Sequence, residues 1–434
     1  MAKTYDTYKD SGIAWIGEIP GEWRVVRLKA LTKEINEKNN PIKTNYVLSL
    51  TIKDGVIPYE KKGDIGNKSK DKHEEYKLAY PNTIVLNSMN ILIGAVGICK
   101  YFGCVSPVYY VFKNNNKSDL HFLNYILSST PFQKYLRKFA NGILEIRLRI
   151  SSNDIIKRHI PCPPLSVQQS ISFFLDTKCG EIDSLISIQE EMISELLAYK
   201  QSVITEAVTK GLDKKAKMKN SGVEWIGDIP EEWEVQKLRT LGWCQNGISK
   251  SGDYFGEDYE YPFVSYPDAY KNFEVPYPKG RANSTLEDRQ RYSLIKGDVL
   301  FTRTSETIEE IGFASTCTET IPNAVFSGFL IRFRPTSPKI YYGYSKYFFR
   351  SIIHRAFFVK EMNLVTRASL SQDLLKNLPV VLPKIEEQQA IATYLDEKTS
   401  QIDSLIALKQ SKIESLKEYK KSIIYEYVTG KKRV

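Results

Sequence analysis

The stretch SGIAWIGEIPGEWRVVRLKAL at residues 11–31 returns as SGVEWIGDIPEEWEVQKLRTL at residues 221–241. A second segment repeats at an offset of 220 residues, as EIDSLISIQEEMISELLAYKQSVITEAVT at 181–209 and QIDSLIALKQSKIESLKEYKKSIIYEYVT at 401–429. The same offset superimposes two pairs of glutamines, Gln168 and Gln169 on Gln388 and Gln389. A period of half the chain is far too long for a solenoid repeat. It predicts two homologous halves.

The stretches between these repeated segments differ from each other. They run from about residue 32 to 146 and from about 242 to 366, and their lengths differ by ten residues. Short β-rich runs and turns alternate in both. In this duplication the flanking segments are repeated and the stretches between them differ. The pattern predicts a common scaffold that carries two different variable regions.

Composition favours a globular protein with a polyanionic partner. The chain has 434 residues, of which 42% are hydrophobic and 12% aromatic, which suits well-buried cores. Its net charge is +10, and basic proteins gain sequence-independent affinity for nucleic acid by releasing counterions; a merely soluble basic surface is the alternative. The six cysteines form no CxxC pair, and no export segment or long apolar run is present, so we expect a cytoplasmic protein without membrane spans.

Local patterns predict strands, hairpins and helices in each half. Alternating residues after a Pro turn predict a strand from Trp23 and another from Trp233, with the repeated tryptophans as core anchors. Aromatic-rich segments that begin at His121 and Tyr341 have helical spacing, which favours core packing over single-strand stacking.

Two segments, from Thr83 and from Gly297, predict hairpins whose apolar first strand ends in polar residues. Arg, Asn, Ser and Thr side chains at such a tip match the hydrogen-bonding groups of the major groove, although an ordinary polar turn is an equal alternative. We take Arg303 as a reader of a base edge, most naturally guanine, and the equivalent Arg147 and Arg367 as phosphate contacts or structural residues. The candidate DNA contacts are Asn87, Ser88, Lys100, Arg147, Arg149, Thr302, Arg303, Ser305 and Arg367.

The repeated segments at 181–209 and 401–429 step apolar residues by threes and fours, which predicts two long helices of roughly 40 residues, each with one apolar face. Each face must pack on the other helix or on another subunit, and chain order suits an antiparallel coiled coil. The predicted subunit or coiled-coil residues are Ile182, Leu185, Ile193, Leu196, Tyr199, Ile402, Leu405, Ile413, Leu416 and Tyr419.

Motifs for chemistry are missing. The four histidines show neither HExxH nor Cys/His spacing, and there is no phosphate-cradling loop, dinucleotide fingerprint, base-methylation motif or convincing nuclease cluster. The sequence therefore predicts a non-catalytic reader without a metal site.

The repeated segments resemble those of type I restriction-modification specificity subunits. SGIAWIGEIPGEW and SGVEWIGDIPEEW resemble the openings of that family's target-recognition domains, and PPLSVQQSISFFLDTKCGEIDSLI and LPKIEEQQAIATYLDEKTSQIDSLI resemble its conserved helical regions. The resemblance implies two α/β (mixed α+β) target-recognition domains separated by an antiparallel coiled coil, with a pseudo-two-fold repeat. The expected domains are residues 1–164 and 213–383, with conserved helical regions at 165–212 and 384–434.

The resemblance also implies partners: double-stranded DNA read as an asymmetric bipartite site, two modification (methyltransferase) subunits and restriction subunits. S-adenosylmethionine, ATP and Mg²⁺ would belong to those partners, and this chain would hold no cofactor. Two other classes stay open at this point, a coiled-coil scaffold that binds protein only and a fused enzyme with its own methylation or cleavage activity.

Overall fold

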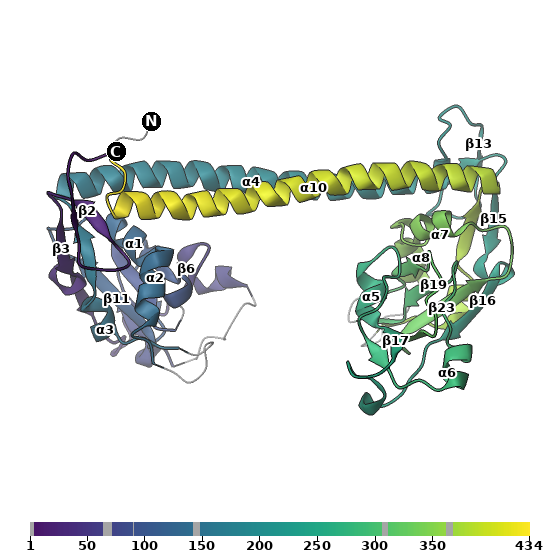
Figure 1. Ribbon diagram of the computed structural model, residues 1–434, viewed down its shortest axis with the longest axis horizontal. Helices are drawn as coiled ribbons and strands as arrows, with labels where there is room; N and C mark the ends of the chain where they lie inside the picture. Colours follow the sequence, from purple (N-terminus) through teal and green to yellow (C-terminus); the bar gives the residue numbers. More distant parts are fainter. Residues whose placement is uncertain (1–3, 64–71, 90, 142–147, 306–310, 362–367) are drawn as a thin grey trace. The chain divides into compact units, whose positions relative to one another are not determined.

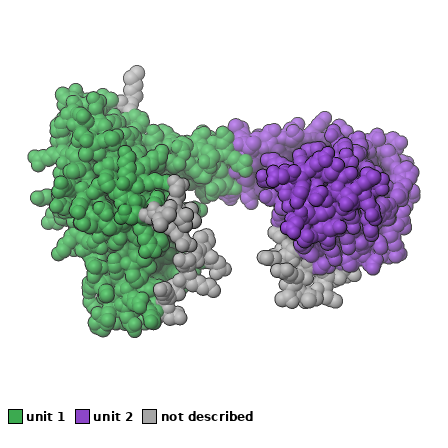
Figure 2. All heavy atoms as spheres, turned by 60° about the horizontal axis from the view of Figure 1, so that its bottom comes forward, with its two compact units in different colours: residues 1–190, 410–434 green, residues 191–409 purple. Residues whose placement is uncertain are grey.

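The computed structural model describes residues 4–63, 72–89, 91–141, 148–305, 311–361 and 368–434. The chain forms two compact units, unit 1 (residues 1–190 and 410–434) and unit 2 (residues 191–409) (Figure 2). The domains expected from the sequence divide the chain where the long helices begin, whereas the compact units divide it within them. Each unit thus holds one recognition region, residues 1–164 or 213–383, and parts of both long helices.

Unit 1 is built on an antiparallel sheet with the strand order β4-β11-β8-β9. These strands are β4 (Thr32–Ile35), β8 (Thr83–Asn87), β9 (Val96–Cys99) and β11 (Tyr109–Asn114). The other strands pair two by two: β1 (Tyr8–Asp10) with β2 (Glu18–Pro20), β3 (Arg24–Arg27) with β12 (His159–Cys162), β5 (Leu48–Thr51) with β6 (Gly55–Pro58), and β7 (Lys77–Ala79) with β10 (Gly103–Val105). The helices are α1 (Leu120–Ser128), α2 (Thr130–Arg137) and α3 (Ser152–Ile156), and buried aromatic residues of α1 and α2 pack on the sheet.

Unit 2 repeats this plan with the sheet order β16-β23-β19-β21. Its strands are β16 (Gly242–Asn246), β19 (Val299–Thr302), β21 (Ala314–Thr316) and β23 (Leu330–Pro335). The equivalent pairs are β13 (Met218–Asn220) with β14 (Asp228–Pro230) and β15 (Glu234–Lys237) with β25 (Pro379–Leu382). Unit 2 also has β17 (Tyr261–Val264), β18 (Arg281–Ala282), β20 (Thr304–Ser305), β22 (Val325–Phe326) and β24 (Ala368–Ser369). Its short helices are α5 (Tyr266–Lys271), α6 (Leu286–Arg291), α7 (Tyr342–Phe348), α8 (Ile353–Glu361) and α9 (Gln372–Lys376) (Figure 1).

The two long helices are α4 (Leu165–Lys210) and α10 (Ile385–Val428). They pair antiparallel in each unit: the rings of Phe174 and Tyr427 lie 4.4 Å apart in unit 1, and Lys200 Nζ lies 2.7 Å from an Asp403 carboxylate oxygen in unit 2. Buried and half-buried side chains step by threes and fours along both, as a coiled-coil seam requires. The seam positions of α4 are Ile171, Leu175, Cys179, Ile182, Ile186, Gln189, Ile193, Leu196, Lys200, Val203 and Ala207, and those of α10 lie 220 residues further on.

Six of the ten predicted subunit or coiled-coil residues pack in the seam, and the other four do not; a subunit-contact role of those four stays a prediction. Ile182, Ile193, Leu196, Ile402, Ile413 and Leu416 lie in the seam, but Leu185, Tyr199, Leu405 and Tyr419 lie outside it and are 46, 55, 46 and 56% exposed. The physical reason is that adjacent helical residues such as Leu185 and Ile186 point about 100° apart at 3.6 residues per turn, so only one of them faces the partner helix.

Each recognition region packs on both long helices. Val428 and Tyr427, at the end of α10, complete the core of unit 1, and Val208 and Ile204, near the end of α4, complete the core of unit 2. A glycine with positive φ follows each helix: Gly211 (73°) comes directly after α4, and Gly430 (71°) comes two residues after α10. A Cβ atom at Gly211 would lie 3.0 Å from the Trp233 ring, and one at Gly430 would lie 3.1 Å from the Trp23 ring. The repeated tryptophans therefore close the helix ends against their own cores.

Candidate nucleic-acid interface

The first glutamine of each repeated pair connects a recognition region to its long helix. Gln168 is fully buried; its Oε1 accepts a hydrogen bond from the Asp119 amide at 2.9 Å, and its Nε2 donates to the carbonyl oxygens of Pro163 at 2.9 Å and Lys117 at 3.3 Å. These bonds hold the residue before α1 against α4. The repeat predicts that the glutamine pair matters in both halves, but it does not indicate this hydrogen-bonding role.

Gln388 makes the same three contacts in unit 2. Its Oε1 accepts from the Tyr341 amide at 2.8 Å, and its Nε2 donates to the carbonyl oxygens of Lys339 at 2.8 Å and Pro383 at 2.9 Å. The repeated frame therefore gives both recognition regions the same anchor on their helices.

Charged and phenolic groups strengthen this anchor. In unit 1 the Tyr125 hydroxyl donates to Asp176 at 2.7 Å, and burial together with this bond raises the pKa of Tyr125. In unit 2 the ammonium group of Lys346 lies 2.6 Å from Asp396 and 2.7 Å from Glu274. Burial opposes the charge of Lys346, but the hydrogen bonds to the two carboxylates outweigh burial and raise its pKa above the ordinary value.

The hairpin residues predicted in unit 1 divide into buried and exposed groups. Asn87 and Ser88 are buried; the Asn87 side chain accepts from the Met89 amide at 3.0 Å, so it supports the turn itself. Lys100 and Arg149 are exposed. The burial of Asn87 and Ser88 does not favour a direct DNA contact in this conformation, and the DNA-binding role of all four residues stays a prediction.

In unit 2 the predicted Thr302 is fully buried and accepts a hydrogen bond from the Phe313 amide at 2.8 Å, so it too belongs to the hairpin framework. Arg303 follows it and is half-buried, with its backbone bonded on both sides: its amide donates to the Phe329 carbonyl at 2.9 Å, and its carbonyl accepts from the Leu370 amide at 2.7 Å. Ser305 ends β20, opposite Ala368 of β24. Arg147 and Arg367 lie outside the described residues.

Arg303 lines an open hollow of about 310 Å³ in unit 2. The other lining residues are Asn246 at the end of β16, Leu370, Ser371, and Gln372, Asp373 and Lys376 of α9. Sequence reasoning did not find Asn246 or Gln372. One sequence signal could have located this corner. A serine caps a short helix in both halves, Ser151 before α3 and Ser371 before α9, where each half of the chain returns to its hairpin.

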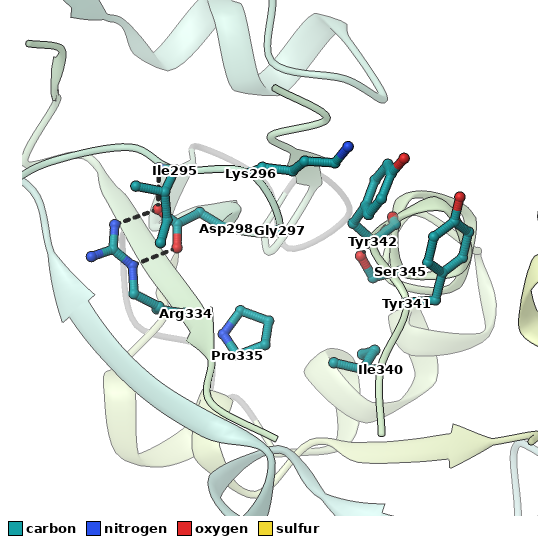
Figure 3. A pocket seen from close by; sticks show the side chains of 10 residues that line it. All are labelled: Ile295, Lys296, Gly297, Asp298, Arg334, Pro335, Ile340, Tyr341, Tyr342 and Ser345. Atoms are coloured by element: carbon teal, nitrogen blue, oxygen red, sulfur yellow. Dashed lines mark hydrogen bonds and ion pairs between the residues drawn. The ribbon is translucent and has the colours of Figure 1, made fainter. Parts of the chain in front are cut away.

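A second hollow, of about 220 Å³, lies at the opposite end of β19 and β23 (Figure 3). Asp298 is fully buried on one side of it and accepts from Arg334 at 2.6 and 2.7 Å, while Lys296 lies 4.3 Å from the Tyr342 ring centre on the other. The charges of Asp298 and Arg334 satisfy each other, so this hollow belongs to the packing of β19 and β23 near α7.

The long helices expose an apolar stripe beside the seam. It consists of Leu185, Ile188 and Tyr419 in unit 1 and of Leu405, Leu408 and Tyr199 in unit 2, so each unit exposes the same set of positions. In unit 2 a hollow of about 700 Å³ lies along α4, the helix that carries Tyr199. Thr205 of α4 and the exposed Ile352 are among the residues that line it. Exposed apolar side chains that recur at equivalent places are typical of protein-protein interfaces.

Among the residues that the structure describes, no helix is both long and apolar enough to span a membrane. Within the same ranges, no three His, Cys, Asp or Glu side chains group as metal ligands would.

Comparisons with known proteins agree with this architecture. The chain is 25% identical over 438 residues to the putative type I restriction enzyme MjaX specificity subunit of Methanocaldococcus jannaschii, which covers 96% of both chains. It is 26% identical to the MjaVIII specificity subunit of the same organism, over 96% of this chain and 94% of that one.

Solved structures show the same fold. A chain from a study of complex assembly and conformational transition of the type I R-M system matches with a TM-score of 0.72 and 15% identity, over 94% of this chain and 98% of that one. The HsdS subunit from Thermoanaerobacter tengcongensis matches with a TM-score of 0.51 and 16% identity, over 95% and 98% of the two chains.

The domain family described as the type I restriction modification DNA specificity domain matches twice, at residues 20–197 and 230–418. The two matched segments begin at equivalent points of the internal repeat, end within one residue of equivalent points and together cover most of the sequence. The chain therefore belongs to the type I restriction-modification DNA specificity family.

Proposed function

We propose that this chain is the DNA-reading subunit of a type I restriction-modification complex, with each recognition region reading one half of an asymmetric bipartite site. The observation that carries the proposal is that the two units share one frame and differ in the side chain that follows the hairpin strand. Where unit 2 has Arg303 after its hairpin strand, unit 1 has Ser88. Equal frames with unequal side chains suit two half-sites of different sequence.

The chain's part in the complex is binding, and the chemistry belongs to its partners. The net charge of +10 favours a phosphate backbone, which supplies affinity without sequence selection. S-adenosylmethionine for methylation, and ATP and Mg²⁺ for restriction, would be held by the modification and restriction subunits. Such a complex works on cellular DNA, in the cytoplasm. The two family matches, which together cover most of the chain, disfavour both a protein-only scaffold and a fused enzyme.

Two modification subunits would dock on the apolar stripe of the long helices. Leu405 and Leu408 of unit 2 repeat Leu185 and Ile188 of unit 1, so the chain offers the same surface twice. Two copies of one partner are the occupants that a duplicated surface fits. The repeated parts of the sequence then serve the repeated partner, and the variable parts serve the DNA.

DNA recognition is tested by selecting bound duplexes from a random library with the chain in complex with its modification subunits. We expect a motif of two specified halves around an unspecified spacer, with affinity that falls steeply as salt rises. Recovery of no motif, or of a single uninterrupted one, would contradict the proposal.

Docking is tested by the double variant Leu405→Glu with Leu408→Glu, read by native mass spectrometry. Two charges on an apolar contact should reduce the number of bound modification subunits from two to one. The control is Ser404→Glu, which places a charge on the exposed face opposite the seam and should leave two bound. The proposal is refuted if both variants retain two modification subunits.

A further inference from the structure

The residue after the buried hairpin strand occupies the same place in both units. Thr302 pairs with Leu330 at the start of β23, and Asn87 pairs with Tyr109 at the start of β11. The next residues, Arg303 and Ser88, are bonded alike. The carbonyl of Arg303 accepts from the Leu370 amide at 2.7 Å, and that of Ser88 accepts from the Ile150 amide at 3.2 Å.

The other walls of the unit 2 hollow have counterparts as well. Asn246 ends β16 beside β23, and Asn36 directly follows β4, which lies beside β11. Gln372 follows the capping Ser371 of α9, and Ser152 follows the capping Ser151 of α3. One strand end, one hairpin residue and one helix start therefore form the same corner in each unit.

In unit 2 this corner holds hydrogen-bonding groups that the protein does not use up. Among the described residues, the Asn246 Oδ1 is buried without a hydrogen-bond partner. The Arg303 side chain donates a long hydrogen bond, from Nη1 to the Gly328 carbonyl at 3.4 Å. The Arg303 backbone is fixed on both sides, so its guanidinium is presented from a rigid base. A buried polar atom without a partner costs free energy, which a ligand that supplies the missing bond recovers.

We propose that Arg303, Asn246 and Gln372 form the base-reading site of unit 2. The equivalent corner of unit 1 holds Ser88, Asn36 and Ser152, of which Ser88 is buried in this conformation. This inference rests on the proposed function and names where the reading occurs. The ligand is the edge of base pairs in the major groove. A guanidinium matches the O6 and N7 acceptors of guanine, and an amide matches the N6 donor and N7 acceptor of adenine.

Difference between the units separates base reading from phosphate binding. A phosphate clamp serves any DNA sequence and needs a cation in both units. The corner of unit 1 has Ser88 where unit 2 has Arg303, and its Ser152 hydroxyl donates to Glu34 at 2.5 Å. The carboxylate of Glu34 beside the corner of unit 1 and the guanidinium of Arg303 in the corner of unit 2 suit two different base edges.

The test is selection from a random duplex library by the complete complex, with wild-type chain and with single variants. Arg303→Ala should reduce discrimination at one position of one half-site by about 5- to 150-fold, the range for one bidentate base contact. Gln372→Ala should relax a neighbouring position of the same half. Asn246→Asp keeps an acceptor but loses the amide donor, so preference should move from adenine toward cytosine.

Controls separate charge, folding and the wider function. Arg303→Lys keeps the charge but loses the planar fork, so it should not restore discrimination. Lys279→Ala removes an exposed charge of unit 2 that does not line the hollow and should leave both half-sites unchanged. The half-site read by unit 1 should persist in every variant, which reports a folded complex within the same experiment.

Equal weakening on all sequences by Arg303→Ala, or rescue by Arg303→Lys, would overturn base reading in favour of phosphate binding. Unaltered motifs in Arg303→Ala and Gln372→Ala, with a bipartite motif for the wild type, would overturn this site while the proposed function stands. Absence of a bipartite motif from the wild type would overturn both.

Discussion

Gln388→Ala tests the anchor that connects the recognition region of unit 2 to its helix. The change removes three hydrogen bonds of 2.8, 2.8 and 2.9 Å from a fully buried amide and leaves the Tyr341 amide without that acceptor. At about 1 kcal/mol net for each bond, and more for a buried group left unsatisfied, we expect unit 2 to lose about 3 kcal/mol or more of unfolding free energy. For a domain of this size that corresponds to a fall of roughly 6 to 12 °C in melting temperature.

Calorimetry of the full chain measures the melting temperature, and hydrogen exchange locates the effect. The amide of Tyr341 should exchange faster in Gln388→Ala, because it loses its acceptor. Gln389→Ala is the matched control: its side chain is the next along α10 and is exposed, so its cost should stay within about 0.5 kcal/mol. Equal costs for the two variants, or unchanged exchange at Tyr341, would refute the reasoning.

Three further predictions concern modularity, spacing and pH. Replacing residues 32–146 with the equivalent stretch of a relative should change one half of the methylated motif, and a change in both halves would count against two separate readers. Removing seven residues from each long helix, 189–195 and 409–415, keeps the heptad seam and should shorten the spacer by about three base pairs, at 1.5 Å per helical residue and 3.4 Å per base pair; methylation mapping of an active complex with an unchanged spacer would reject this. Burial lowers the pKa of His354 to about 3, so the unfolded chain binds a proton below pH 6.5 that the folded chain does not, and stability should fall by about 1.4 kcal/mol per pH unit as pH drops from 6.5 toward 3. His354→Phe should remove this part of the slope in denaturant titrations, and an identical slope in both proteins would show that another group causes it.

The common scaffold of the two halves was predictable because the segments that form it are repeated in the sequence. Repeated tryptophans, repeated glutamines and repeated apolar spacing each identify positions where both halves need the same contact. Trp23 and Trp233 are buried as predicted, and α4 and α10 begin within a few residues of the expected starts. A residue that is repeated in both halves gives information that otherwise comes from comparing homologous sequences.

Details that depend on side-chain direction were not predictable. Leu185 and Ile186 are both apolar and adjacent, and spacing by threes and fours admits either one, so the seam was assigned partly to the exposed neighbour. Asn87 and Thr302 are the last residues of apolar strands, where a polar side chain can face solvent or bond the hairpin's own backbone, and both do the latter. The role of Gln388 was missed because a glutamine beside a charged helix normally suggests a surface position.

The duplicated frame also explains how one chain combines symmetry with asymmetry. The Gln168 and Gln388 anchors make the same three hydrogen bonds, so the same contacts hold each recognition region on its repeated long helix. In the proposed site a difference in base reading needs no change of backbone conformation. The same backbone position carries Arg303 in unit 2 and Ser88 in unit 1, and the side chain there determines which base edge can be bound. Changes at that corner leave the anchors and the exposed stripe untouched. Specificity can therefore vary in one half while the partner surfaces, and the other half, keep their structure.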